Sequence, residues 1–170
     1  MAEEKEKTFS ELLDMLELQE DVLQFRHFTN SDAWELGSFM VQEARKNGLK
    51  IAISIRLNSG VTVFQHFMDG ARLNNEHWMQ RKFNVVNEME TSSLYLYTKL
   101  KKTNRTMADI FLEEKNYANA GGGFPIRIED VGVIGAILVS GMNHVADHDF
   151  IIKCLAKYLH TDEVPRIKEM

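Results

Sequence analysis

Residues 121–141 read GGGFPIRIEDVGVIGAILVSG, and this stretch decides the fold. Its second half, residues 131–139, is apolar at odd and even positions alike, so a strand here presents apolar side chains to both faces of a sheet. A strand buried on both faces belongs in the interior of the sheet. The sequence therefore predicts a central strand at 131–139, preceded by a shorter strand at 124–128.

The strongest local signal elsewhere is a hairpin. In residues 50–57, KIAISIRL, isoleucine and leucine alternate with other residues, which is typical of a strand with one firmly buried face. Residues 58–60, Asn-Ser-Gly, supply the turn, and residues 61–68 return as the partner strand. A fifth strand is predicted at 22–28. Apolar periodicity predicts helices near 8–16, 31–46, 74–89, 92–102 and 145–159.

These elements predict a single α+β domain over residues 1–170, with about five mostly antiparallel strands flanked by helices. If helices covered only one sheet face, the apolar side chains of residues 131–139 on the other face would need a second subunit. Closed symmetry built from dimers is then the expected arrangement.

Bulk composition restricts the class of protein. The net charge of −5 argues against a nucleic-acid partner, because binding to phosphates needs a cationic surface. No apolar run approaches the roughly 20 residues that cross a bilayer, so no membrane partner is expected. Cys154 is the only cysteine and cannot form an internal disulfide, and the N-terminal MAEEKEK has no apolar segment typical of a signal peptide. These features predict a cytoplasmic protein.

Three segments together resemble a known family. They are LKIAISIRLNSGVTVFQHFMDGAR at 49–72, GGGFPI at 121–126 and GVIGAILVSGMNHVADHDFI at 132–151. In order and spacing they are similar to the haem-degrading HbpS-like (GlcG-like) domain family. The resemblance implies a profilin-like sheet flanked by helices, assembly into a homo-oligomer, and haem or another planar anionic molecule as a candidate ligand.

The end of the central strand is one candidate ligand wall. Ser140 and Gly141 precede a helix, and a helix N-terminus exposes unpaired N–H groups that bind anions such as a carboxylate. The competing interpretation is that Ser140 or Asn143 simply caps the helix. Asp147 falls on the apolar side of this helix, where a carboxylate must be hydrogen-bonded or paired, and capping alone would also explain it.

The other candidate walls are the turn after residue 67 and the glycine triplet. The triplet has no lysine and Ser/Thr in P-loop spacing, so it is interpreted as a lid or a rim contact of a shallow pocket. The predicted ligand-binding residues are Met68, Asp69, Gly70, Arg72, Gly121, Gly122, Gly123, Pro125, Ser140, Gly141 and Asp147. His77, Arg81 and Lys82 are interpreted as a charged, exposed helix face.

Evidence for metal binding or covalent catalysis is weak. His144 and His148 are four residues apart and could bind zinc or iron, but no HExxH motif or cysteine pair accompanies them, and solvent exposure is the preferred interpretation. Cys154 lies on the apolar side of the last helix, which predicts an inert buried thiol. No catalytic set is visible.

Three functions follow. The first is a non-catalytic or weakly catalytic, oligomeric domain that binds haem or another small anionic ligand. The second is an oligomeric adaptor that binds partner proteins without a small ligand. The third, suggested by the family resemblance, is an enzyme acting on a small organic acid.

Overall fold

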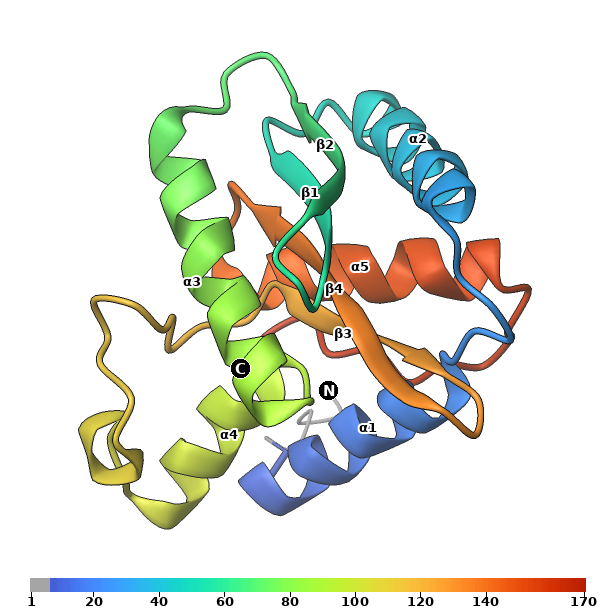
Figure 1. The fold of residues 1–170 in the computed structure, drawn as a ribbon. Helices are drawn as coiled ribbons and strands as arrows, with labels where there is room; N and C mark the ends of the chain where they lie inside the picture. The colour runs from blue at the N-terminus through green and yellow to red at the C-terminus, as the bar shows by residue number, and fades with distance from the viewer. Residues whose placement is uncertain (1–6) are drawn as a thin grey trace, which may run out of the picture.

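The order of elements in the computed structural model follows the predicted pattern closely (Figure 1). The structure describes residues 7–170, so the first six residues of the charged N-terminal stretch lie outside the described residues. The elements are α1 (Phe9–Val22), α2 (Asn30–Lys46), β1 (Ala52–Leu57), β2 (Thr62–Phe67), α3 (Leu73–Met89), α4 (Ser93–Thr103), a 3-10 turn (Ala108–Ile110), β3 (Gly123–Ile128), β4 (Gly132–Ser140) and α5 (His144–Tyr158).

The strands form one antiparallel sheet in the order β2-β1-β4-β3. The predicted central strand is confirmed, because β4 pairs with β1 on one side and β3 on the other. The strand predicted at 22–28 is wrong, and the sheet has 4 strands. α1 continues through Val22, and of the segment that follows only Phe25 makes a bridge, to Ile128 at the end of the edge strand β3.

Helices of the same chain cover both faces of the sheet, with α3 in front of it and α5 behind it in Figure 1. On one face Ile137 and Val139 join a core with residues of α2 and α5. On the other face Ala136 and Leu138 pack against Met79 and other residues of α3. The sheet therefore needs no second subunit to cover it, and an oligomer stays a prediction that must rest on other grounds.

Helix starts are fixed by side chains that accept backbone N–H groups. Thr8 and Glu11 form the predicted capping box of α1, and Thr29 and Asp32 form a second one at α2. α1 packs on α4 at one end of the sheet, where Leu12, Leu16 and Leu94 share a small core (Figure 1). No helix in residues 7–170 is long and apolar enough to span a membrane.

Candidate functional site

Two of the predicted walls, the glycine triplet and the segment from Ser140 to Asp147, meet at a buried ion pair between α3 and α5. Lys82 Nζ lies 3.1 Å from Asp147 Oδ2 and donates to the Val139 carbonyl at 2.7 Å. The two side chains are 3% and 2% exposed. The interpretation of Lys82 as an exposed residue is wrong, because α3 lies across the sheet and its Met79 and Phe83 face the core on either side of Lys82.

Burial and attraction act against each other at this pair. Burial lowers the pKa of the Lys82 ammonium and raises the pKa of the Asp147 carboxyl, and the Coulombic attraction between the two groups opposes both shifts. Asp147 Oδ1 also accepts the Met142 N–H at 2.9 Å. The predicted need for a partner for Asp147 is confirmed, and the partner is Lys82.

The glycine triplet closes over this ion pair. All three glycines are buried, so their interpretation as a lid or rim is wrong. A Cβ on Gly122 would lie 2.5 Å from Lys82 Nζ and 2.6 Å from the Val139 oxygen, which leaves no room for a side chain. The Gly121 N–H donates to His144 Nδ1 at 3.0 Å and the Gly123 N–H to Ser93 Oγ at 3.0 Å. Glycine is required here by close packing.

The β2–α3 turn adjoins the same end of β4. Asn75 Nδ2 donates to Ser140 Oγ at 3.1 Å, and Asn75 Oδ1 accepts the Arg72 N–H at 2.9 Å. Gly70 packs against the Lys50 side chain, and Gly141 against the backbone of residues 50–51. Pro125 lies in β3 opposite Ala136, within the sheet. The structure thus brings most of the predicted residues together.

The groups expected to receive an anion have partners within the chain. Asn143 Oδ1 accepts the Ala146 N–H at 2.9 Å, so the capping interpretation holds for Asn143, whereas Ser140 Oγ contacts Asn75 instead. The Met142 amide donates to Asp147. A ligand role for the predicted residues stays a prediction, while the structure shows a polar core that joins α3, α5 and β4.

The two histidines of α5 are held in place by hydrogen bonds. His148 is fully buried, which corrects the expected exposure, and its Nε2 lies 2.8 Å from Gln19 Oε1 of α1. His144 Nδ1 accepts the Gly121 N–H, which places the proton of the neutral ring on Nε2 and leaves no free lone pair there for a metal. Within residues 7–170 no group of three or more His, Cys, Asp or Glu side chains could hold a metal ion.

Burial raises the pKa of the Cys154 thiol to about 12, in agreement with the predicted buried cysteine. A thiol that stays protonated over the physiological range is a poor nucleophile, so nothing at this position points to covalent catalysis.

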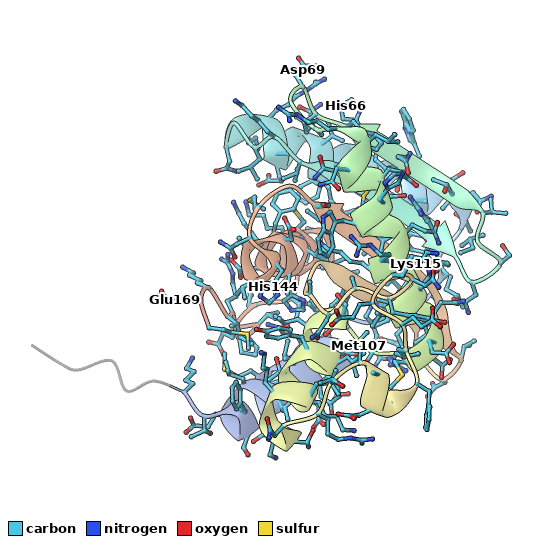
Figure 2. All side chains as sticks on the ribbon, turned by 90° about the vertical axis from the view of Figure 1, so that its left-hand side faces the viewer. His66, Asp69, Met107, Lys115, His144 and Glu169 are labelled. Carbon is cyan, nitrogen blue, oxygen red and sulfur yellow. The ribbon has the colours of Figure 1, made fainter. Side chains whose placement is uncertain are left out.

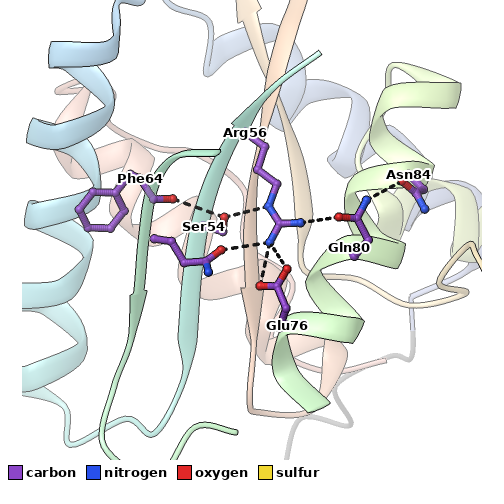
Figure 3. Close-up of polar contacts among 7 residues, drawn as sticks. Ser54, Arg56, Phe64, Glu76, Gln80 and Asn84 are labelled. Atoms are coloured by element: carbon purple, nitrogen blue, oxygen red, sulfur yellow. Dashed lines mark hydrogen bonds and ion pairs between the residues drawn. The ribbon is translucent and has the colours of Figure 1, made fainter. Parts of the chain in front are cut away.

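A second polar cluster, which sequence reasoning missed, centres on Arg56 (Figure 3). Its guanidinium reaches from β1 toward α3 and donates to Glu76 at 2.8 Å and to Gln80 at 2.9 Å. Ser54 and Gln65 accept its remaining bonds. The signal that could have found it is the i,i+4 spacing of Glu76 and Gln80 opposite a strand arginine. Because its donors have partners, this cluster joins the sheet to α3.

Two surface clefts lie away from these polar clusters. The first, here called the apolar cleft, has a volume of about 680 Å³ and is lined by Thr106, Met107, Ala108, Phe111, Leu112, Glu113 and Glu114. The second, here called the acidic cleft, has a volume of about 560 Å³ and is lined by Val22, Gln24, Phe25, Arg26, His27, Asp32, Glu35, Glu129, Tyr158, Leu159 and Thr161. Neither includes a predicted ligand-binding residue.

The apolar cleft and the β2–α3 turn lie at opposite ends of the molecule. Figure 2 shows Met107 in the lower part of the molecule, Lys115 near its middle, and His66 and Asp69 at the top, and Figure 1 separates the β2–α3 turn from the segment after α4 in the same direction. The apolar cleft belongs to the excursion between α4 and β3, residues 104–122. The sequence predicts a short helical turn after Thr106, which the 3-10 turn matches, but nothing in the sequence shows that the residues around it line a cleft.

Comparison with known proteins places this fold in a family. Residues 28–156 match the family described as haem degrading protein HbpS-like. The UPF0303 protein YE1367 of Yersinia enterocolitica is 36% identical over 139 residues, 81% of this chain and 82% of that protein. The solved Ybr137w protein is 27% identical with a TM-score of 0.82, covering 89% of this chain and 90% of that chain.

A more distant structure, the PduOC:haem complex, has a TM-score of 0.62 at 18% identity and covers 76% of this chain and 93% of that chain, a likeness of fold. An antiparallel sheet with helices on both faces is thus the shared α+β architecture. The chain belongs to the HbpS-like family, as its three sequence segments indicated.

Proposed function

We propose that this protein is a non-enzymatic binding protein that holds a flat, largely apolar acid, with haem as the first candidate, in the apolar cleft. Family membership and the haem complex of a structural neighbour support the ligand class. The cleft volume of about 680 Å³ falls within the range of small-molecule sites. Among the apolar lining residues Phe111 is the exposed contact, and the almost fully buried Met107 and Leu112 form the floor beneath it.

The observation that carries the proposal is the conformation of Phe111. Its ring is 95% exposed, and its φ of +61° lies in the left-handed region, which is unusual for an aromatic residue. Such a conformation costs about 1–3 kcal/mol and persists only where the surroundings impose it. The buried neighbours Met107 and Leu112 fix the turn through the Leu112 N–H to Met107 carbonyl bond of 3.0 Å. The ring is therefore presented to solvent as a stacking surface.

Charged residues of both signs border the cleft: its lining includes Glu113 and Glu114, and Arg105 and Lys115, next to lining residues in the sequence, are the groups that could meet an acidic group of the ligand. The Arg105 guanidinium donates to the Asp109 carbonyl at 2.9 Å, which holds it beside the cleft, and Lys115 follows the lining residue Glu114. No histidine is among the lining residues. Because no lining histidine is available to bind the haem iron, binding would depend on the porphyrin ring and its carboxylates. Metal-free porphyrin would therefore bind with an affinity similar to that of haem.

The test is a titration with haemin and with protoporphyrin IX, followed by absorbance and by fluorescence quenching. Both should bind with similar affinity, and Phe111→Ala should weaken both about fivefold, since an aromatic contact of this kind contributes on the order of 1 kcal/mol. Leu73→Ala is the matched control, because Leu73 is 70% exposed at the start of α3 near Asp69, and it should change nothing. Binding of haemin alone, or equal effects of both variants, would contradict the proposal.

The near-complete exposure of Phe111 favours a second candidate, in which the ring anchors a partner protein. In that case neither porphyrin binds, and Phe111→Ala removes a specific co-purifying protein that the Leu73→Ala variant retains. The two candidates share a surface, so the porphyrin titration decides between them.

A further inference from the structure

The acidic cleft is built by segments that are far apart in the sequence. The α1–α2 connection, the start of α2, the β3–β4 turn and the end of α5 each contribute lining residues. The backbone of the connection is fixed on β3, because the Phe25 N–H donates to the Arg127 carbonyl and the Glu129 N–H to the Phe25 carbonyl, both at 2.8 Å. The cleft is therefore a defined feature of the fold, on elements held by backbone hydrogen bonds.

One wall of the cleft is an oriented histidine. Asp32 Oδ2 accepts the Thr29 N–H at 2.7 Å and the Thr29 hydroxyl at 3.0 Å, and His27 Nδ1 lies 3.1 Å from the same oxygen. These hydrogen bonds, led by that from the Thr29 backbone, lower the pKa of Asp32, so the carboxylate is ionised at neutral pH. An ionised carboxylate needs a donor, which places the proton of a neutral His27 ring on Nδ1. Nε2 is then an acceptor on a side chain that is 78% exposed.

The remaining lining groups are also mostly acceptors. Glu35 and Glu129 add carboxylates at the exposed surface, and Tyr158 contributes a half-buried phenol. Burial, and to a smaller extent Glu35 and Asp32, raise the pKa of this phenol, and all three groups line the same cleft. The lining contains three carboxylates and one guanidinium, that of Arg26, so its charge is predominantly negative.

Because the lining groups are mostly hydrogen-bond acceptors and carry net negative charge, the cleft favours a positively charged ligand with several hydrogen-bond donors. Ammonium groups supply three donors each, and an aromatic ring such as that of Tyr158 attracts cations through its face. We propose that the acidic cleft is a binding site for a small organic cation, a primary amine or diamine, which donates to His27 Nε2 and to the Glu35 and Glu129 carboxylates. This site shares no residue with the apolar cleft, so either proposal can fail without the other.

The test compares three four-carbon compounds of similar length by two-dimensional NMR of the 15N-labelled full chain: 1,4-diaminobutane, 1,4-butanediol and succinate. The diamine should produce saturable shifts at the amides of residues 24–35, 129 and 158–161, and the neutral diol and the dianion should not. The shifts should weaken at high salt, because the carboxylates are exposed and screened. Saturable binding of succinate or of the diol at these residues would overturn the proposal.

Variants separate a defined site from general attraction to a protein of net charge −5. Glu35→Gln with Glu129→Gln should raise the Kd for the diamine about tenfold, the effect of losing about 1.4 kcal/mol of charged contacts. His27→Ala should raise it less. Glu88→Gln with Glu169→Gln removes the same charge elsewhere on the surface and should leave the Kd unchanged. An equal loss in both pairs, or no loss in the first, would show attraction without a site.

Discussion

Gly122 has a φ of +113° and faces the Lys82 ammonium and the Val139 carbonyl. Alanine at this position would be strained in its backbone and would press a methyl group on two polar atoms. We expect Gly122→Ala to lower the free energy of unfolding by at least about 3 kcal/mol, as measured by urea denaturation.

Gly60 offers the matched control for this substitution. It has a φ of +93° and nothing within 4 Å of the position where a Cβ would lie. Gly60→Ala should therefore cost only the backbone strain, about 1 kcal/mol. Equal losses in the two variants would show that close packing on the ion pair contributes nothing.

We expect the effects of substituting Lys82 and Asp147 on the free energy of unfolding to be non-additive. Lys82→Met strands a buried carboxylate and Asp147→Leu strands a buried ammonium, so each should cost about 3–5 kcal/mol. The double variant buries no unpaired charge and should be more stable than either single variant. A double-mutant cycle in urea measures this directly, and additive losses would refute a net contribution from the pairing.

Among the elements, α1 carries two contacts that respond to pH in opposite directions. Burial raises the pKa of Glu20, which faces the Ser92 amide and Arg127, to about 7. Burial lowers the pKa of His148, bonded to Gln19, to about 3. Both groups therefore link the docking of α1 to proton binding.

Between about pH 6.5 and 4.5, Glu20 and His148 change the free energy of unfolding in opposite directions. As pH falls from about 7 to 4.5, native Glu20 takes up a proton before the unfolded chain does, which stabilises the fold. As pH falls from 6.5 to about 3, the unfolded chain protonates His148 while the native ring stays neutral, which destabilises it. Each contribution is on the order of a few kcal/mol.

The variants should separate these contributions. In Glu20→Gln, stability should fall continuously as the pH is lowered from 6.5, and in His148→Gln it should rise as the pH is lowered from 7 to 4.5. Urea unfolding at pH 7.5, 6.5, 5.5 and 4.5 measures both slopes. Parallel pH profiles for the wild type and either variant would show that the substituted group is not linked to folding.

For the whole molecule, periodic elements could be predicted from the sequence, and contacts between elements could not. β4 could be predicted because a strand that is apolar on both faces fits only the interior of a sheet. The β1–β2 hairpin could be predicted because its alternating apolar residues and its Asn-Ser-Gly turn both indicate the same structure. The strand at 22–28 failed because a short apolar run does not distinguish a strand from a helix end and a single bridge.

In the candidate site, too, single residues could be predicted from the sequence, whereas their contacts with other elements could not. Asp147 was identified from one helix, but its partner Lys82 is 65 residues away, and only the packing of α3 on the sheet brings the two together. The glycine triplet was interpreted as a lid or rim because the sequence does not show what it contacts, and those contacts depend on that same packing. The two clefts are lined largely by loops and helix ends, whose conformations leave no periodic signal.

Residues beyond α5 complete the packing of α1. The Pro165 carbonyl accepts from Gln19 across 146 positions of sequence, and Ile167 is buried with Leu12 and Leu16. During synthesis, therefore, the apolar side of α1 stays uncovered until residues translated some 150 codons later have been added. Over that interval the nascent chain exposes these leucines to chaperones and to misassembly.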